Sequence, residues 1–275
     1  MNRLSTAERA RIVSCLVEGN SLRATARMTG FARMTIEKLL RDLGKACAQY
    51  QDEHLRNLTT KRVQCDEIWS FVYAKKKNVT TEITEKHPDA GDAWTWTAID
   101  ADSKLVISWL VGSRDAGAAY TFMTDVASRL RNRVQMTTDG HKPYLEAVES
   151  AFGSDIDYAV LQKIYGAEAG SETRYSPAVC LGCKVEEISG QPNAKHISTS
   201  YVERQNLTKR MHMRRFTRLT NAFSKKFEML AHNVALHFMY YNFGKVHQTL
   251  RVTPAMESGV SDHVWSIDEL VGLLG

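Results

Sequence analysis

Apolar side chains in the first fifty residues recur at intervals of three and four, the spacing of one face of a helix. Ser5 followed by Glu8 is typical of a capping box, and Gly19-Asn20 ends the first helix. Ser21 begins a short second helix that Gly30 ends, and a third helix is predicted from about Ala32 to Leu43. The pattern therefore predicts three short helices, with these positions turned inward: Ile12, Val13, Leu16, Val17, Ile36, Leu39 and Leu40.

The pattern changes after a polar connection at about Gln49–Lys61. Residues 63–73, VQCDEIWSFVY, are β-branched or aromatic on both alternating faces, which predicts a central strand buried on both sides. The segments AWTWTAID and LVISWLVG predict two further strands, so the first three strands form a meander.

Helices and strands alternate in the next part of the chain. A helix is predicted at Ala116–Arg131, a strand at Val134–Thr138, a helix from Pro143 to about Phe152 and a strand at Ile156–Leu161. A long connection at Gln162–Thr199 and a long amphipathic helix at Phe223–Phe243 follow. This order predicts a mixed α/β fold behind an all-α N-terminal unit.

Charge is unevenly distributed along the 275 residues, whose net charge is only +5. Residues 1–50 hold nine Lys/Arg against four Asp/Glu, residues 204–227 hold eight against none, and the remainder is acidic. Two basic segments around an acidic middle suit a protein that grips a polyanion while carboxylates hold cations. A solvated basic face is the plain alternative for either segment.

The N-terminal helices resemble helix-turn-helix DNA-binding units in the spacing of Ala26, Gly30 and Ile36. A small residue lets the two helices approach, glycine supplies a turn with positive φ, and isoleucine fixes the next helix to the core. If that helix enters the major groove, its basic and polar positions would contact bases and phosphates. These positions are Arg33, Thr35, Lys38 and Arg41. A plain three-helix packing module is the alternative.

Three acidic motifs follow in order: DEIWSFV in the first strand, TDGHKPY at the end of the fourth, and SYVERQNLTKRMHMRRFTRLT opening a late helix. With the predicted order of elements, these motifs resemble the DDE transposases of bacterial insertion sequences, in particular the insertion-sequence-one (IS-one) group. The resemblance covers nearly all of residues 60–255. It implies an RNase H-like catalytic domain whose catalytic and metal-binding triad is Asp66, Asp139 and Glu203.

The implied chemistry is DNA cleavage and strand transfer at two Mg²⁺ or Mn²⁺ ions. Two such ions about 3.5–4 Å apart stabilise the attacking and leaving oxygens of a phosphodiester, and magnesium prefers oxygen ligands. Because side chains alternate along a strand, we expect only one of Asp66 and Glu67 to face a given site. The resemblance implies that it is Asp66. Each acid taken singly would more often be an ordinary surface carboxylate or helix cap.

The basic residues after Glu203 are predicted to bind the DNA beside the scissile bond. Glu203, Asn206, Arg210 and Arg214 fall close to one helix face. The full set of DNA contacts predicted in this segment is Asn206, Lys209, Arg210, Arg214, Arg215 and Arg218.

The five cysteines have irregular spacing, which favours free thiols in a reducing compartment. Cys180 and Cys183 form a lone C-x-x-C near His196, whereas a structural zinc normally has four ligands. Loop cysteines are therefore the default, with a zinc site as the alternative. No apolar run approaches the roughly 20 residues of a membrane span, and the amino terminus lacks a signal-peptide pattern. We expect a cytoplasmic, nucleoid-associated bacterial protein with no membrane partner.

The predicted domains are a helix-turn-helix at 1–48, a linker at 49–61, an RNase H-like domain at 62–255 and a C-terminal tail at 256–275. The partners implied by the resemblance are double-stranded DNA, as terminal repeats and target, and further copies of the chain on paired ends. Two alternatives stay open: a simple metal-dependent DNA nuclease, and an inactivated transposase that acts as a DNA-binding regulator.

Overall fold

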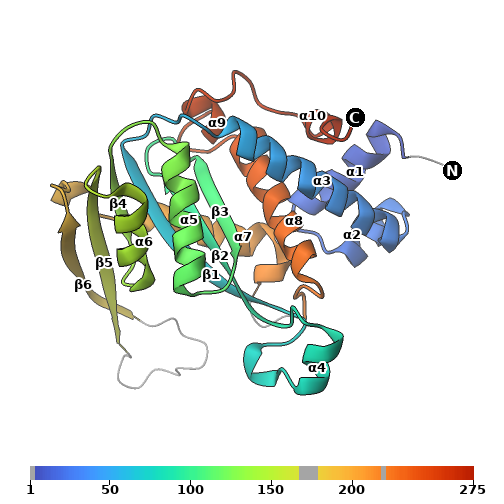
Figure 1. The fold of residues 1–275 in the computed structure, drawn as a ribbon. Coiled ribbons are helices and arrows are strands. Elements are labelled where there is room, and N and C mark those ends of the chain that lie inside the picture. The colour runs from blue at the N-terminus through green and yellow to red at the C-terminus, as the bar shows by residue number, and fades with distance from the viewer. Residues whose placement is uncertain (1–3, 167–178, 218–220) are drawn as a thin grey trace.

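A six-stranded sheet forms the centre of the computed structural model, which describes residues 4–166, 179–217 and 221–275 (Figure 1). The strand order is β3-β2-β1-β4-β5-β6. The strands are β1 (Arg62–Val72), β2 (Gly91–Asp100), β3 (Val106–Gly112), β4 (Val134–Thr138), β5 (Ile156–Gly166) and β6 (Val179–Ser189). The predicted mixed α/β fold is confirmed.

Strand β1 lies in the middle of this sheet, as its sequence predicts. It pairs antiparallel with β2 and parallel with β4, while β2 and β3 complete the expected meander. Odd and even residues of β1 belong to two different hydrophobic clusters: Cys65 packs in one with Trp96, and Ile68 in the other with Val202. Both faces of the strand are therefore covered, which requires apolar side chains on both.

Helices cover the two faces of the sheet. α5 (Ala116–Arg129) and α6 (Pro143–Phe152) lie across one face (Figure 1) and contribute to the cluster around Cys65. α7 (Ser200–His212) and α8 (Phe227–Met239) contribute to the cluster around Ile68, on the other face. The short helix α4 (Thr81–Lys86) lies in the connection from β1 to β2.

The N-terminal helices are α1 (Thr6–Val17), α2 (Leu22–Thr29) and α3 (Arg33–His54). They gather at one end of the molecule with α10 (Ile267–Gly272), next to α9 (Pro254–Glu257) (Figure 1). Ser5 and Glu8 form the expected capping box. Gly30 has a φ of 79°, the positive value that its predicted turn requires.

The third helix is much longer than its sequence indicates, since α3 continues from the expected end at Leu43 to His54. Gly44 looks like a helix terminator, but it is a buried contact: a Cβ at this position would meet Cβ of His232 at 2.5 Å and its backbone oxygen at 2.7 Å. Glycine here lets α3 lie directly against α8. The predicted linker 49–61 thus begins inside α3, whose apolar side chains share one cluster with the sheet.

Two other elements differ from the expectation. β5 continues beyond Leu161 to Gly166, and it pairs with β6 inside the long connection expected at Gln162–Thr199. The helix expected at Phe223–Phe243 begins only at Phe227, because Ser224 forms a parallel bridge to Val72 at the end of β1. After Met239 the helix closes with a π-helical turn at Tyr240–Gly244.

The contact of α3 with α8 predicts that Gly44→Ala destabilises the fold. The added methyl group has no space, so we expect a loss of about 1–3 kcal/mol in the free energy of unfolding, as overpacked cores show. Gly272→Ala is the matched control, since a Cβ there meets nothing within 4 Å. Urea unfolding compares the two variants, and equal midpoints would contradict the packing described.

Candidate active site

Three carboxylates meet where β1 and β4 lie side by side. Asp66 and Glu67 are consecutive on β1, and Asp139 follows the last residue of β4. Parallel pairing of Cys65 with Thr138 places Asp139 next to the pair. One oxygen of each carboxylate lies within 4.8 Å of the other two. We call these three residues the acidic cluster.

The expectation that Glu67 faces away from this site is wrong. Alternation does direct Asp66 and Glu67 toward opposite faces of the sheet. However, β4 ends at Thr138, so Asp139 lies just beyond the pairing of the two strands. At that edge a carboxylate is accessible from both faces, and Asp139 approaches both of its acidic neighbours.

The side chains around the cluster partly compensate its negative charge. Arg114 Nε donates to Glu67 Oε1 at 2.7 Å, and its Nη2 lies 4.0 Å from Asp139 Oδ2. Tyr144 donates its hydroxyl to Glu67 Oε2 at 3.0 Å. Burial, and then the charge of Asp139, raise the pKa of Glu67. One guanidinium thus bridges two of the three acids.

Asp66 lies in the least favourable position for a negative charge. Burial, followed by the charges of Glu67 and Asp139, raises the pKa of Asp66 to about 7. Asn206 donates from Nδ2 to Asp66 Oδ2 at 2.7 Å. Burial lowers the pKa of Lys209, one turn further along α7, to about 7, although the negative charge of Asp66 acts in the other direction.

Helix α7 is attached to the face of the sheet that carries Asp66. Gln64, two residues before Asp66 on the same face, accepts hydrogen bonds from the backbone N–H groups of Tyr201 (2.8 Å) and Val202 (3.2 Å). At the other end of the helix, Lys209 donates from Nζ to Oγ1 of Thr97, the residue paired with Asp66 on β2. Side-chain contacts before, at and beside Asp66 therefore fix the helix across the site.

Glu203 lies on this helix but outside the acidic cluster. Its Oε2 accepts from Nζ of Lys163 on β5 at 2.5 Å, and its Oε1 accepts from the Thr199 hydroxyl at 2.6 Å. It stands one turn before Asn206, the residue that contacts Asp66. The structure thus brings together Asp66 and Asp139 of the predicted triad. The third acid, Glu203, is held outside the cluster by Lys163.

The donor set fits a hard divalent cation. All the groups are oxygens, the preferred ligands of magnesium and manganese. The side chain of Asn206, which contacts Asp66, also supports a cation site. Its Oδ1 is buried and has no hydrogen-bond partner in the described residues. A buried unpaired oxygen is unfavourable unless a cation or water meets it. The carboxylate oxygens of Asp66, Glu67 and Asp139, with the side chain of Asn206 beside Asp66, therefore suit such an ion.

Two residues predicted to bind DNA belong to the interior. Lys209 has no exposed surface and lies with its ammonium 5.6 Å from the ring centre of Phe238. Asn206 is also buried and binds Asp66. Both face the sheet because α7 presents that side to β1 and β2. The helix position that predicted a DNA contact instead places these two side chains against the site.

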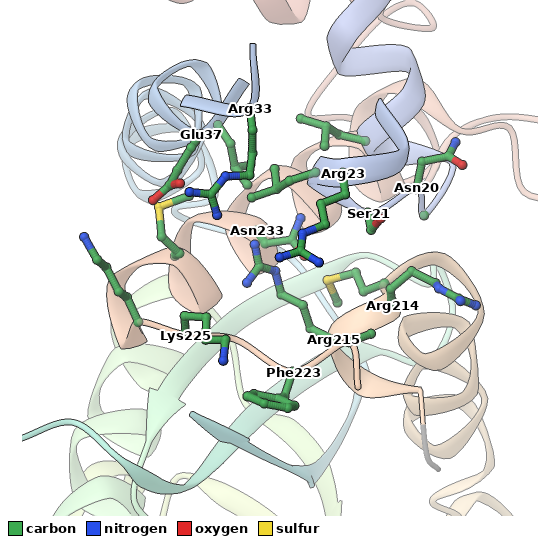
Figure 2. A pocket seen from close by; sticks show the side chains of 18 of the residues that line it. Asn20, Ser21, Arg23, Arg33, Glu37, Arg214, Arg215, Phe223, Lys225 and Asn233 are labelled. Carbon is green, nitrogen blue, oxygen red and sulfur yellow. The ribbon is translucent and has the colours of Figure 1, made fainter. Parts of the chain in front are cut away.

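Other predicted DNA contacts surround a cavity of about 850 Å³ between the N-terminal helices and the segment that follows α7 (Figure 2). We call it the basic cavity, because six lysine and arginine side chains and a single acidic one, Glu37, line it. The basic side chains are Arg23, Arg33, Arg214, Arg215, Lys225 and Lys226. Arg23, Arg33 and Arg215 point toward one another from separate segments (Figure 2).

The remaining predicted contacts are dispersed. Lys38 pairs with Asp42 at 2.7 Å, and Arg41 lies 3.7 Å from Glu228 on α8. Thr35 is half-buried beside them on α3, and Arg210 is half-buried on α7. Arg218 lies outside the described residues.

The C-x-x-C pair has no third ligand beside it in the part of the chain that the structure describes. Cys180 and Cys183 lie exposed on β6, and His196 binds Arg62 through Nδ1 at 2.8 Å. Among the described residues, the acidic cluster is the one group of three or more His, Cys, Asp or Glu side chains close enough to share a metal.

No helix in the described part of the chain is long and apolar enough to cross a membrane.

Sequence reasoning missed Glu67, Arg114 and Tyr144 as members of the site. Arg114 follows β3 and Tyr144 opens α6, so no local pattern connects either of them with β1. One available signal was the direct adjacency of Asp66 and Glu67. Two consecutive acids in a strand that is buried on both faces each need a cation or a hydrogen-bond donor, one on either face of the sheet.

The raised pKa of Asp66 predicts a specific dependence of stability on pH in the metal-free protein. Folding makes this carboxyl bind its proton more tightly, so the free energy of unfolding falls as pH rises from about 4 to about 7 and stays lowered above that. Asp66→Asn removes this loss. We expect the variant to be more stable than the parent by about 1–3 kcal/mol at about pH 8, with the difference vanishing near pH 4.

Chemical denaturation across this pH range measures the effect. Asp89→Asn, at an exposed aspartate in the loop before β2, is the control and should follow the parent at every pH. A parallel shift of Asp66→Asn and the parent, with no change in their difference, would show that Asp66 titrates normally.

Comparisons with known proteins extend only to remote structural likeness. No protein-family model and no curated protein sequence matches the chain. Of the solved structures, it is similar to a Mos1 transposase paired-end complex with left transposon end, at 12% identity and a TM-score of 0.25 over 57% of this chain and 60% of that chain. It is also similar to a piggyBac transposase synaptic complex with hairpin DNA, at 11% identity and a TM-score of 0.39 over 98% of this chain and 69% of that one.

A third similar structure is a pre-cleavage Mos1 transpososome, at 10% identity and a TM-score of 0.23 over 87% of this chain and 78% of that one. The chain spans about 60% of the first of these three. At TM-scores below 0.5 these similarities carry no argument about function, which must come from the chain's own residues.

Proposed function

We propose that this chain is a DNA transposase of the DDE type, which binds the ends of an insertion sequence and catalyses metal-dependent cleavage and strand transfer. One observation carries the proposal: Asp66 and Asp139 meet on adjacent central strands, beside a helix that leads directly to the basic cavity. Two acids brought together at this cost in repulsion need a cation, and the nearby arginines need an anion. A DNA phosphodiester at a metal centre satisfies both.

The topology supports the RNase H-like part of this proposal. Three antiparallel strands precede two that run parallel to β1, in the order β3-β2-β1-β4-β5. Asp66 lies on β1 and Asp139 directly follows β4, two inner strands of this order. The helix with Glu203 crosses β1. On this reading β6 is an addition at the edge of the sheet.

In the proposed mechanism, Asp66 and Asp139 would hold Mg²⁺ or Mn²⁺, and Glu203 would complete the triad. A pair of bound ions would supply Lewis-acid activation of the attacking oxygen and stabilise the leaving oxygen. Asn206 orients Asp66 through its Nδ2 donor. Arg114 holds Glu67 and the neighbouring side of Asp139, which keeps the cluster assembled despite its charge.

The helix-turn-helix role of α1–α3 remains part of the proposal. Arg33, at the start of α3, faces the basic cavity together with residues after α7. We propose that the N-terminal helices recognise double-stranded element ends, and that copies of the chain assemble on paired ends.

An inactive regulator is the second candidate, because Lys163 binds Glu203 outside the acidic cluster. A chain that had lost catalysis could retain this ion pair and still bind DNA through the N-terminal helices. A simple nuclease would cleave without joining. Products of the reaction separate all three possibilities.

Activity is tested with labelled duplexes made from the DNA that flanks the coding sequence, in Mg²⁺ or Mn²⁺. We expect nicked and joined products from the parent chain. Asp66→Asn and Asp139→Asn should reduce both products by more than about a hundredfold, because each removes a charge that holds the metal. Duplex binding should stay within about twofold of the parent's affinity.

Glu257→Gln, at an exposed glutamate on α9, is the control and should cleave normally. Binding without cleavage by the parent would favour the regulator, and nicks without joining would favour the nuclease. Normal strand transfer by Asp66→Asn or Asp139→Asn would contradict the proposed site.

The third ligand is tested separately through Mn²⁺ binding, measured by electron paramagnetic resonance. If Glu203 completes the site, Glu203→Gln weakens binding about 10–100-fold, and Glu67→Gln weakens it less because Arg114 and Tyr144 already hold Glu67. The reverse order of effects would assign the third position to Glu67. Lys163→Gln should strengthen binding by releasing Glu203.

A further inference from the structure

Beyond the acidic cluster, β1 carries a row of aromatic side chains that the proposed mechanism does not use. Trp69 and Phe71 follow Glu67 at intervals of two residues, so they share its face of the strand. Cys65 and Glu67 on that face are buried, but Trp69 and Phe71 are half-exposed. Apolar rings that extend from a reactive site into solvent need an explanation of their own.

A third ring completes this row from another segment. Phe223 stacks on Phe71 with ring centres 4.9 Å apart and an angle of 29°, and Phe71 lies 5.6 Å from Trp69. The bridge between Ser224 and Val72 holds the two segments together. We call Trp69, Phe71 and Phe223 the aromatic strip.

Lysine side chains lie over these rings. Lys75 Nζ is 5.7 Å from the ring centre of Trp69 and 5.9 Å from that of Phe71. Lys225 Nζ is 4.8 Å from the ring centre of Phe223. Both lysines are exposed. Each aromatic face is thus accompanied by a cation that can meet a phosphate next to a stacked base.

The aromatic strip leads into the basic cavity, because Phe223 belongs to the strip and also lines the cavity, as does Lys225 over its ring (Figure 2). Ser224, between them, accepts from Nη1 of Arg215 at 2.8 Å. Burial lowers the pKa of Arg215 to about 10, so its guanidinium keeps its charge at neutral pH. A half-buried cation facing a cavity with a single acid favours an anionic occupant.

We propose that the aromatic strip and the basic cavity together bind an unpaired DNA strand that extends from the acidic cluster. Bases stack on Trp69, Phe71 and Phe223, and the backbone meets Lys75, Lys225 and Arg215. Base pairs inside a duplex are not suitable ligands, since both of their faces are already stacked on neighbouring pairs. The cavity volume, about 850 Å³, lies in the ~300–1,000 Å³ range of small-ligand sites and is too small for the body of a duplex.

This inference rests on the proposed function, because cleavage at the acidic cluster is what would supply an unpaired strand. It adds a substrate class to that function: single-stranded DNA beside the cut. Trp69 lies only two residues from Glu67, or about 7 Å at the rise of a strand. A strand released at the cluster therefore meets the first ring at once.

The experiment measures the affinity of labelled oligothymidylate and of a blunt duplex by fluorescence anisotropy, without divalent metal. Phe71→Ala and Phe223→Ala should each weaken oligothymidylate binding about 5–150-fold, the equivalent of one lost stacking contact. Duplex affinity should change by less than about twofold. Phe71→Tyr should retain binding, because it retains a ring.

Tyr120→Ala is the matched control, at an exposed aromatic residue on α5 outside the strip, and should bind as the parent does. Thermal unfolding confirms that each variant is folded. If Phe71→Ala proves unfolded, Lys225→Gln gives an independent reading. It should lower the slope of log affinity against log salt by about 0.7, the value for one phosphate contact on a single strand.

Unchanged oligothymidylate binding in the folded Phe71→Ala and Phe223→Ala variants would overturn the inference. So would inorganic polyphosphate that competes as well as oligothymidylate of equal charge, because charge alone would then explain binding. Asp66→Asn separates this result from the proposed function. It should lose cleavage and keep oligothymidylate affinity, so each claim can fail while the other stands.

Discussion

The arrangement of this site depends on the parallel pairing of β1 with β4. Pairing of Cys65 with Thr138 forces Asp66, Glu67 and Asp139 into one small volume, although three carboxylates repel one another there. The surrounding side chains follow from that constraint. Arg114 and Tyr144 hold Glu67, Asn206 holds Asp66, and buried Lys209 supplies a cation whose pKa burial has lowered to about 7.

Helix α7 connects the acidic centre to the basic surface. Gln64 and Thr97 fix its inner side to the sheet on either side of Asp66, and the chain beyond its end supplies Arg214 and Arg215 to the basic cavity. One short segment thus carries carboxylate, amide and guanidinium groups between the acidic cluster and the basic cavity. Arg214 and Arg215 have no acidic neighbours in the sequence because they line the basic cavity.

The sequence predicted the central strands well because β1 is apolar on both faces, a pattern that only a strand covered on both sides needs. It also predicted the placement of Asp66 and Asp139, since both acids sit in or directly after strands. The third helix was expected to end at Leu43, too early, because the glycine that follows it suits a helix end and a close helix contact alike, and only the contact with α8 distinguishes the two. Glu67 was misjudged because alternation describes a strand and not the edge where its neighbour stops. Lys209 and Asn206 were misassigned because the α7 face that meets the sheet depends on tertiary packing.

Cleavage of the protein backbone by bound iron tests the central claim most directly. Fe²⁺ substituted for the proposed Mg²⁺, with ascorbate and peroxide, generates hydroxyl radicals that cut the chain beside the ion. We expect fragments ending near Asp66, Asp139 and Glu203, all suppressed by excess Mg²⁺. Cuts confined to other segments, such as the one around Cys180 and Cys183, would contradict a metal site built on the pairing of β1 with β4.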